Sequence, residues 1–267
     1  MKVLVTGGNG FLGQYVQDAL WDAGQDAIIL DRPDSVLDIG PSTPLADAVI
    51  HLAGVLGTAE LFNDFDHAVD VNVKGTQRVL EYCRLNGASY VGITMPTVWA
   101  NVYQATKLCA RTLATAWHES FGVPVAHVRA YNAFGIGQKY GPGHPQKIIP
   151  TFSTLAWRGE TIPIWGNGEQ TVDLVSASDI ASVLVQAIAF GDDEIFDAGS
   201  GREWSVNRVA QMVIQHTHSS SQVKRLPMRV GERPNTRLYA KGEGWDRLVE
   251  RPEFKLDALI ETINSYR

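Results

Sequence analysis

The glycine-rich segment near the start of the chain limits what the chain can fold into more than any other stretch. It reads "TGGNGFLG" and directly follows the short β-branched run "KVLVT" at 2–6. Apolar residues at helical spacing come next and end at Gly24. In such a strand–turn–helix unit, Gly7 permits the tight turn, Gly10 lets the backbone approach a pyrophosphate, and Gly13 lets the helix pack on the strand. The segment therefore predicts an α/β fold with an anion site at the N-terminus of its first helix.

The alternation of strand and helix continues along the chain. We expect buried strands at 2–6, 27–30, 47–54, 90–94, 124–130 and 194–199, with helices between them. This order predicts an α/β protein with a Rossmann-type doubly wound parallel sheet and a small C-terminal substrate lobe. We assign residues 1–130 plus about 172–200 to the dinucleotide-binding domain, and about 131–171 and 201–267 to the smaller lobe.

Charge and composition exclude several classes of protein. The 267 residues carry a net charge of −6 without a basic block, so we expect no nucleic-acid partner. No apolar run approaches the roughly 20 residues of a membrane span, so we expect no membrane partner. The chain enters "MKVLVTGG" without a signal segment, which predicts a cytoplasmic protein. The seven histidines show no metal-ligand spacing, so we expect no metal site.

Asp31 indicates which dinucleotide the fold would bind. It ends the second predicted strand, 18 residues after Gly13. A carboxylate at this place can accept hydrogen bonds from both hydroxyls of an adenosine ribose, and it would repel a 2′-phosphate. NAD is therefore favoured over NADP. The neighbouring Arg32 works against this preference, because an arginine can accommodate that phosphate.

Tyr103 and Lys107 are the candidate catalytic pair. They lie four residues apart and would share one face of a helix, although this spacing alone is common by chance. Their position is more specific, because the pair opens the helix after the predicted strand 90–94, at the edge of the sheet where such folds bind ligands. Lys107, together with the charge of an oxidised nicotinamide, would lower the pKa of the Tyr103 phenol. The phenolate could then take the proton of a substrate hydroxyl while the adjoining carbon is oxidised.

Together these motifs resemble the extended short-chain dehydrogenases/reductases, and most closely their NAD-dependent nucleotide-sugar epimerases and dehydratases. The similar segments of the first half are "TGGNGFLG", "LDI" at 37–39, "VIHLAG", "VNVKGTQRVLE" and "YQATK". Those of the second half are "RAYNAFGIGQ", "IPIWGNGEQTVDLVSASDIA" and "LPMRVGERPN". The resemblance implies NAD as the cofactor, a nucleotide-diphosphate sugar as the substrate, with a UDP-sugar favoured, and a homodimer formed through residues 70–86 and 101–121.

The resemblance also implies roles for single residues. The residues implied to contact the pyrophosphate of the cofactor are Gly7, Gly10, Phe11, Leu12 and Gly13. Asp31 and Arg32 are implied to contact the adenosine ribose, and Asp38 and Ile39 the adenine. Near the nicotinamide the resemblance implies Leu52, Ala53, Gly54 and Asn72, with Lys107 on the nicotinamide ribose beside Tyr103. Asn132 and Arg229 match positions that contact the diphosphate, and Trp165 matches the aromatic residue against the base. The alternatives are a core role for Trp165 and a solvated loop charge for Arg229. Asp173 is expected to brace the lobe.

One departure from the family pattern concerns the hydroxyl that usually assists the tyrosine. Met95 stands where the family places a Ser or Thr, and methionine donates no hydrogen bond. Loss of one such donor typically lowers a rate about 10²–10³-fold. Thr94 and Thr97 flank Met95, although in an extended segment Thr94 would face the other way. Thr94 is therefore kept as a candidate third catalytic residue beside Tyr103 and Lys107.

Two further departures bear on the reaction. The loop that usually walls the sugar pocket shrinks to the three residues 100–102, and Val172 replaces an arginine that contacts the diphosphate. The segment "TMPTV" lacks the acidic residues of a 4,6-dehydratase. The hypothesis is therefore an NAD-dependent nucleotide-sugar 4-epimerase, or a closely related sugar-nucleotide oxidoreductase, that acts by transient oxidation at C4. The alternatives are an NAD(P)H-dependent ketosugar reductase and a cofactor-binding protein of this fold with weak or no catalysis.

Overall fold

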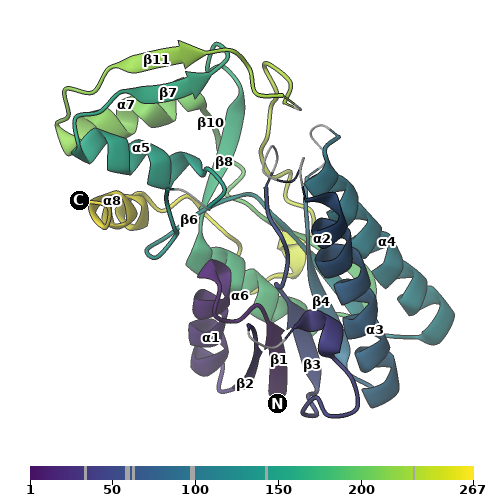
Figure 1. The fold of residues 1–267 in the computed structure, drawn as a ribbon. Coiled ribbons are helices and arrows are strands. Elements are labelled where there is room, and N and C mark those ends of the chain that lie inside the picture. Colours follow the sequence, from purple (N-terminus) through teal and green to yellow (C-terminus); the bar gives the residue numbers. More distant parts are fainter. Residues whose placement is uncertain (33–34, 58–60, 62–63, 97–99, 142–143, 231) are drawn as a thin grey trace.

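A six-stranded sheet with the order β2-β1-β3-β4-β5-β9 contains five strands from the first half of the chain and one, β9, from the second half (Figure 1). The computed structural model describes residues 1–32, 35–57, 61, 64–96, 100–141, 144–230 and 232–267. The strands are β1 (Lys2–Thr6), β2 (Asp26–Leu30), β3 (Ala48–His51), β4 (Ser89–Thr94), β5 (Val125–Ala130) and β9 (Asp192–Ala198). All neighbouring strands are parallel. The predicted Rossmann-type sheet is confirmed.

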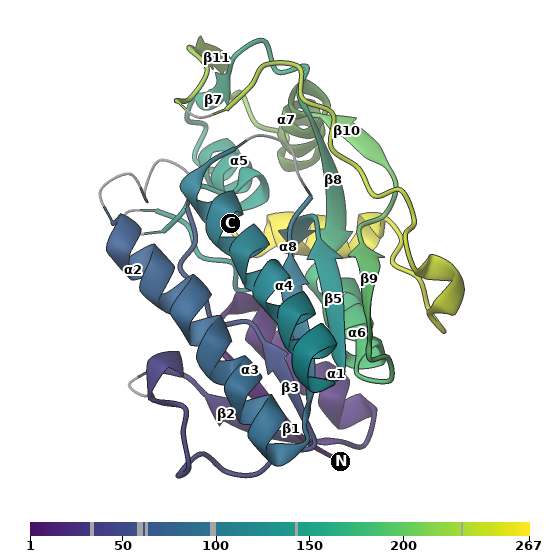
Figure 2. The ribbon, with the colours of Figure 1, turned by 90° about the vertical axis from the view of Figure 1, so that its right-hand side faces the viewer.

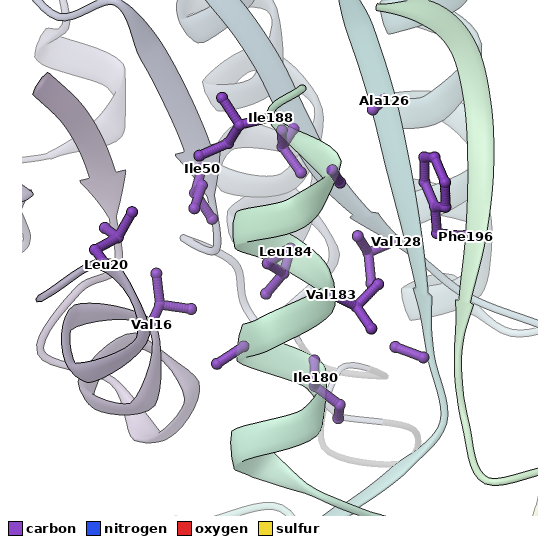
Figure 3. Close-up of a cluster of buried hydrophobic side chains, with 14 of the residues drawn as sticks. Val16, Leu20, Ile50, Ala126, Val128, Ile180, Val183, Leu184, Ile188 and Phe196 are labelled. Atoms are coloured by element: carbon purple, nitrogen blue, oxygen red, sulfur yellow. The ribbon is translucent and has the colours of Figure 1, made fainter. Parts of the chain in front are cut away.

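One face of this sheet is covered by α1 (Phe11–Asp22) and α6 (Ala177–Ala187), which pack against each other. Figure 3 shows Val183 of α6 beside the sheet residue Val128, and Leu184 on the side of α6 that faces Leu20 of α1. These side chains are fully buried. Because both faces of the sheet are covered, its strands read as nearly continuous apolar runs, which is why they were visible in the sequence.

The other face is covered by the helices that carry the candidate catalytic pair. In chain order they are α2 (Phe65–Val69), a π-helical turn (Asp70–Lys74), α3 (Gly75–Asn86) and α4 (Val102–Phe121). Figure 2 shows α3 and α4 side by side in front of the sheet. The side chain of Asn101 caps α4 by accepting a hydrogen bond from the Gln104 amide at 2.9 Å, and the helix ends at Gly122 with φ 69°. The cap places Tyr103 in the first turn of α4.

A smaller lobe lies above the sheet in Figure 1. Its elements are β6 (Asn132–Phe134), α5 (Ile148–Trp157), β7 (Ile162–Trp165), β8 (Thr171–Ser176), β10 (Glu203–Ser205), α7 (Val206–Thr217), β11 (Val223–Leu226) and α8 (Leu256–Asn264). The strands form a three-stranded sheet, β10-β8-β6, and the pair β11-β7. Short 3₁₀ turns lie at Val36–Asp38 and Trp245–Arg247. A separate apolar cluster around Phe134, Ile164 and Leu259 forms the core of the lobe.

The predicted strands and helices lie where the observed ones do, with two differences. The strand expected at 47–54 ends at His51. The strand expected to be buried at 27–30 is the edge strand β2, whose residues are exposed or partly exposed because only β1 of the described strands pairs with it. The strand expected at 194–199 joins the sheet as β9, next to β5. The short strands of the lobe were not anticipated, because runs of three or four residues show no clear alternation. The brace expected at Asp173 is confirmed, since its carboxylate accepts hydrogen bonds from the amides of Ser200, Gly201 and Ala240, each at 2.9 Å. The division of the chain into two domains stays a prediction.

Candidate active site

The glycine-rich turn joins β1 to α1 and leaves the helix N-terminus open. Gly7 adopts φ +72°, and a Cβ on it would lie 2.8 Å from the backbone nitrogen of Ala53. A Cβ on Gly13 would lie 2.3 Å from the carbonyl oxygen of Gly8, because the helix passes close to the turn. Gly10 precedes α1 and makes no side-chain cap. The first amides of α1 are thus available to an anion, as the motif predicts.

Phe11 and Leu12 begin α1 beside this turn, and both are partly exposed. The Phe11 ring packs edge-on against Tyr15, with 5.6 Å between ring centres. The Tyr15 hydroxyl donates to the carbonyl oxygen of Ile136 at 3.0 Å. Helix α1 therefore links the glycine-rich turn to the smaller lobe.

Asp31 lies at the end of β2, next to the same turn. Its Oδ2 accepts the Asn9 amide at 2.8 Å and its Oδ1 accepts the Arg32 amide at 2.7 Å. These bonds fix the carboxylate and leave each oxygen a further lone pair for a ribose hydroxyl. The Arg32 side chain is exposed. Of the two residues expected near the adenine, Asp38 is exposed and Ile39 is buried in the core between the sheet and α3.

Asn72 joins the turn after β3 to helix α4. Its Oδ1 accepts the Val55 amide at 2.8 Å, and its Nδ2 donates to the Val55 carbonyl and to Thr106 Oγ1, each at 3.0 Å. Thr106 Oγ1 donates in turn to the Tyr103 carbonyl at 2.9 Å. A Cβ on Gly54 would lie 3.1 Å from Asn72 Oδ1, so this position favours a residue without a side chain. The turn that carries Gly54 is therefore held in a fixed position relative to Tyr103.

Tyr103 and Lys107 lie in the first two turns of α4. Lys107 is only 5% exposed and forms no hydrogen bond or salt bridge with any residue that the structure describes. Burial lowers the pKa of Lys107 to about 8. Burial also raises the pKa of the Tyr103 phenol above its usual range. The direction is opposite to the one expected for Tyr103 with a bound nicotinamide, so in the protein alone the phenol stays protonated.

His51 takes part in the site although the sequence analysis did not single it out. Its Nδ1 lies 2.7 Å from Thr6 Oγ1 and its Nε2 lies 3.1 Å from Thr76 Oγ1. Thr76 Oγ1 donates its proton to the Asn72 carbonyl at 2.7 Å, so it accepts from His51 Nε2. Thr6 Oγ1 accepts the Ala53 amide at 3.2 Å and is free to donate to Nδ1. The ring is therefore a neutral imidazole that connects β1, β3 and α3.

Burial, and then the positive charge of Lys107, lower the pKa of His51 to about 3. The ring thus stays neutral near physiological pH. The signal in the sequence was a histidine at the end of the apolar strand "AVIH", but its partners lie 45 and 25 residues away. Spacing along the chain does not show such a contact.

Thr94 ends β4 on the face of the sheet that α4 covers. Side chains alternate along a strand, and Tyr90, four residues earlier, packs in the core on this face. Thr94 is 1% exposed, and its Oγ1 has no hydrogen-bond partner in the described part of the chain. Met95, the next residue, is partly exposed in a cleft. Thr97, the other candidate hydroxyl, lies outside the described residues.

The three predicted substrate residues come from the smaller lobe. The buried Oδ1 of Asn132, at the start of β6, has no partner among the described residues. The Arg229 guanidinium carbon lies 5.7 Å from the centre of the Trp165 ring, and its Nη2 lies 2.7 Å from Glu232 Oε1. Trp165 is partly exposed, so it is not a core residue. The structure thus brings Trp165 and Arg229, 64 residues apart in the chain, into contact.

The hydrogen-bond donors and acceptors that remain available in the site fit a bound dinucleotide. The open N-terminus of α1 suits a pyrophosphate, and the carboxylate of Asp31 suits a ribose. Lys107 is a buried residue that forms no hydrogen bond or ion pair within the described ranges, so its ammonium is available to ribose hydroxyls. Three separate parts of the chain therefore present the groups that NAD requires.

Neither a metal-binding cluster nor a membrane-spanning helix is found in the described part of the chain. Among the residues that the structure describes, no group of three or more His, Cys, Asp and Glu side chains could hold a metal ion. Within the same ranges, no helix has the length and apolar character needed to cross a membrane.

A parallel Rossmann-type sheet with Tyr103 and Lys107 on the helix after β4 defines a protein of the short-chain dehydrogenase/reductase class. The model of the NAD dependent epimerase/dehydratase family matches residues 3–199. The chain belongs to this family. The recognition made from the sequence motifs is confirmed.

Individual relatives share the family but not one reaction. The UDP-N-acetyl-alpha-D-glucosaminuronate decarboxylase of Bacillus cytotoxicus is 28% identical over 273 residues, which cover 85% of this chain and 83% of the relative. The dTDP-L-rhamnose 4-epimerase of Burkholderia thailandensis is 23% identical over 80% of this chain and 81% of its own length. A crystal structure of the UDP-glucose 4-epimerase of Thermotoga maritima superposes with a TM-score of 0.90, at 23% identity, over 100% of this chain and 99% of that one. The superposition supports the fold.

Proposed function

We propose that this chain is an NAD-dependent nucleotide-sugar 4-epimerase, or a closely related sugar-nucleotide oxidoreductase. The observation that carries the proposal is the pair Tyr103 and Lys107, with Lys107 buried and unpartnered among the described residues at the carboxyl edge of the sheet. Membership of the NAD dependent epimerase/dehydratase family supports it. A dinucleotide-binding site alone does not require a tyrosine and a lysine in adjacent turns of this helix.

The first domain would hold the cofactor through the groups described above. The amides at the start of α1 bind the pyrophosphate, Asp31 accepts the ribose hydroxyls, and Lys107 donates to the nicotinamide ribose. When bound, NAD supplies reversible oxidation and reduction at a carbon of the substrate. The hydrogen bonds of Asn72 fix the turn that carries Gly54 relative to the helix that carries Tyr103. The substrate carbon and the phenol oxygen can therefore be held close together.

The protein's own part in the chemistry is the movement of one proton. Tyr103 Oη takes the proton of the C4 hydroxyl as C4 becomes a carbonyl, and returns it when the carbonyl is reduced. Because burial raises the pKa of Tyr103, the phenol needs positive charge nearby to ionise, and Lys107 provides it from the next turn. Thr94 is the candidate second donor to the reacting oxygen, in place of the hydroxyl missing at Met95.

The sugar nucleotide would lie between the two lobes. Trp165 stacks on the base, an interaction of about 1–3 kcal/mol per base. Arg229, in contact with Trp165, and Asn132 bind the diphosphate. A UDP-sugar is favoured, since the nucleotide sugars named for structures of this fold include UDP-glucose and UDP-glucuronic acid.

The test is conversion of nucleotide sugars by the purified protein with NAD. UDP-glucose, UDP-galactose, UDP-N-acetylglucosamine and dTDP-glucose are incubated with the wild type and with Tyr103→Phe, and the products are separated by ion-pair chromatography. We expect C4 inversion of at least one sugar by the wild type and none by the variant. Tyr82→Phe is the matched control, because Tyr82 is also a buried tyrosine but bonds Pro44 and Ala46 far from the site.

The same experiment separates the alternatives. A ketosugar reductase would consume NADH in proportion to product, whereas an epimerase consumes none. A cofactor-binding protein without catalysis would bind NAD equally well as wild type and as Tyr103→Phe and convert no sugar. Conversion to a 4-keto-6-deoxy sugar would replace the proposal by a dehydratase.

We further propose a cytoplasmic homodimer formed through α3 and α4, which lie side by side on one face (Figure 2). Leu85 and Phe121 are 66% and 56% exposed on these helices, which supports an apolar contact there. Light scattering behind size exclusion tests the dimer. A monomer at micromolar concentration would count against it.

A further inference from the structure

A cleft of about 400 Å³ opens on the α4 side of the sheet, beyond the ends of β4 and β5. Its walls are Met95 and Pro96 after β4, Arg129 at the end of β5, Arg111 on α4, and part of a segment near the C-terminus, residues 237–243, here called the strap. Seven residues, 95–101, connect Thr94 to Val102. The first two residues of this shortened connection, Met95 and Pro96, thus border the cleft.

The cleft is lined by positive charge. Its lining includes Arg111, Arg129, Arg237 and Lys241, and no Asp or Glu residue. Two of these cations are paired with carboxylates. Arg129 bonds Asp197 Oδ1 at 2.9 Å and Glu243 Oε2 at 2.8 Å, and Arg237 Nε bonds Glu203 Oε1 at 2.7 Å.

Arg111 and Lys241 are the remaining cations of the cleft. Neither forms a salt bridge with a carboxylate of the described residues. The charge of Arg111 contributes to the lowered pKa of Asp193, without a hydrogen bond between them. Lys241 Nζ lies 5.0 Å from the centre of the Tyr239 ring. The cleft therefore has two positive charges without an ion-paired partner among the described residues, one from α4 and one from the strap.

Buried carboxylates hold the strap in place. Asp197 accepts the amides of Lys241 at 3.0 Å, Gly242 at 3.1 Å and Glu243 at 3.2 Å. Asp173 accepts the Ala240 amide at 2.9 Å. Both carboxylates are 0% exposed, and buried carboxylates are stable only when their hydrogen bonds are satisfied. The backbone of Lys241 is therefore a fixed wall of the cleft and not a freely moving loop.

Two residues of the cleft are close in the chain to the candidate catalytic residues. Met95 directly follows Thr94, and Arg111 lies one turn beyond Lys107, about 6 Å further along the helix axis. A group held between Arg111 and Lys241 would thus contact the same helix that carries Tyr103 and Lys107. Carboxylates and phosphates are the groups that an arginine and a lysine bind best.

We propose that this cleft binds a compact oxyanion, a carboxylate or a phosphate, between Arg111 and Lys241. The oxyanion is either a substituent of the sugar in the substrate or a free small anion that binds beside it. The first form rests on the proposed function, because it requires a nucleotide sugar in the adjacent site, whereas the second does not.

Calorimetric titration of the NAD-loaded protein tests the proposal with three probes: UDP-glucuronate, UDP-glucose as its uncharged match, and inorganic phosphate. Arg111→Met and Lys241→Met are compared with the wild type. For a sugar-borne anion, each variant weakens UDP-glucuronate binding about tenfold, the effect of losing one charge-assisted bond, and leaves UDP-glucose within about twofold. For a free anion, the same loss appears with phosphate, and the two UDP-sugars bind the wild type alike.

Arg158→Met and Lys2→Met are the controls, since both residues are exposed and lie away from the cleft. Arg111→Lys keeps the charge and should retain most of the binding. Equal affinity of the wild type and both cleft variants for UDP-glucuronate and phosphate overturns the proposal. If neither UDP-sugar binds the wild type, the proposed function fails instead, and the phosphate titration still decides the cleft.

Discussion

Replacement of Lys107 by methionine tests whether the buried charge of Lys107 lowers the stability of the cofactor-free protein and serves to bind the ligand. Lys107 is 5% exposed and has no hydrogen bond or ion pair within the described structure. Methionine has a similar length and keeps the apolar contacts of the stem. The variant should therefore make the cofactor-free protein more stable while it removes activity, as expected where function requires a strained site.

The size of the effect follows from the pKa of Lys107, which burial lowers from 10.5 to about 8. One pKa unit corresponds to about 1.4 kcal/mol, so the charged lysine destabilises the folded state by about 3 kcal/mol at pH 7. Between about pH 8 and 10.5 the unfolded chain binds more protons than the folded one, so the free energy of unfolding of the wild type rises with pH. The advantage of Lys107→Met is thus full below about pH 8 and small near pH 10.

Thermal unfolding of the cofactor-free protein at pH 7 and pH 10 measures this. For a chain of this size, about 3 kcal/mol corresponds to a rise in Tm of roughly 5–10 °C at pH 7. Adding NAD should raise the Tm of the wild type more than that of the variant. Lys224→Met, at an exposed lysine of β11 without an ion pair among the described residues, is the control and should change little. A Lys107→Met protein that is no more stable than the wild type at pH 7 would refute the reasoning.

Three further predictions address other parts of the site. Gly7→Ala places a Cβ 2.8 Å from the Ala53 nitrogen at φ +72°, which destabilises the native turn by at least about 1–2 kcal/mol. The variant should therefore not bind NADH in a fluorescence titration. Unchanged binding would show that this turn does not hold the cofactor. Asp31→Ala should weaken NAD binding about tenfold to a hundredfold and spare NADP, whereas an equal loss of both would argue against a ribose contact. His51, with a pKa of about 3, should make the protein lose stability as pH falls from about 6.5, by about 2 kcal/mol at pH 5 in urea unfolding. His51→Gln should remove this part of the pH dependence, and a persisting slope would place its origin elsewhere.

The sheet and the cofactor motifs could be predicted because their causes are local. A strand buried on both faces must be an apolar run, and a turn that approaches a neighbouring backbone at Gly7 must lack a side chain. The start of α4 could likewise be located from the strand before it, which placed Tyr103 and Lys107 at the edge of the sheet. These features need no knowledge of distant contacts.

The parts that could not be predicted depend on contacts between distant residues. The bonds of His51 to Thr6 and Thr76 become visible only when three elements meet. The strap is held by Asp197 across 44 to 46 residues of chain, and no motif marks that carboxylate. The rise in the pKa of Tyr103 in the protein alone comes from burial, which the spacing of residues along the chain does not show. The lowering expected with a bound nicotinamide stays a prediction.

The central claim, transient oxidation at C4 with Tyr103 as the proton carrier, is tested most directly with a nucleotide sugar deuterated at C4. The protein is incubated with NAD and the labelled sugar in ordinary water, and the product is examined by mass spectrometry and NMR. We predict inversion at C4 with the deuterium still on that carbon, and a fall in rate of at least about 10²-fold in Tyr103→Phe. A product without deuterium at C4, or inversion at an unchanged rate in Tyr103→Phe, would contradict the account.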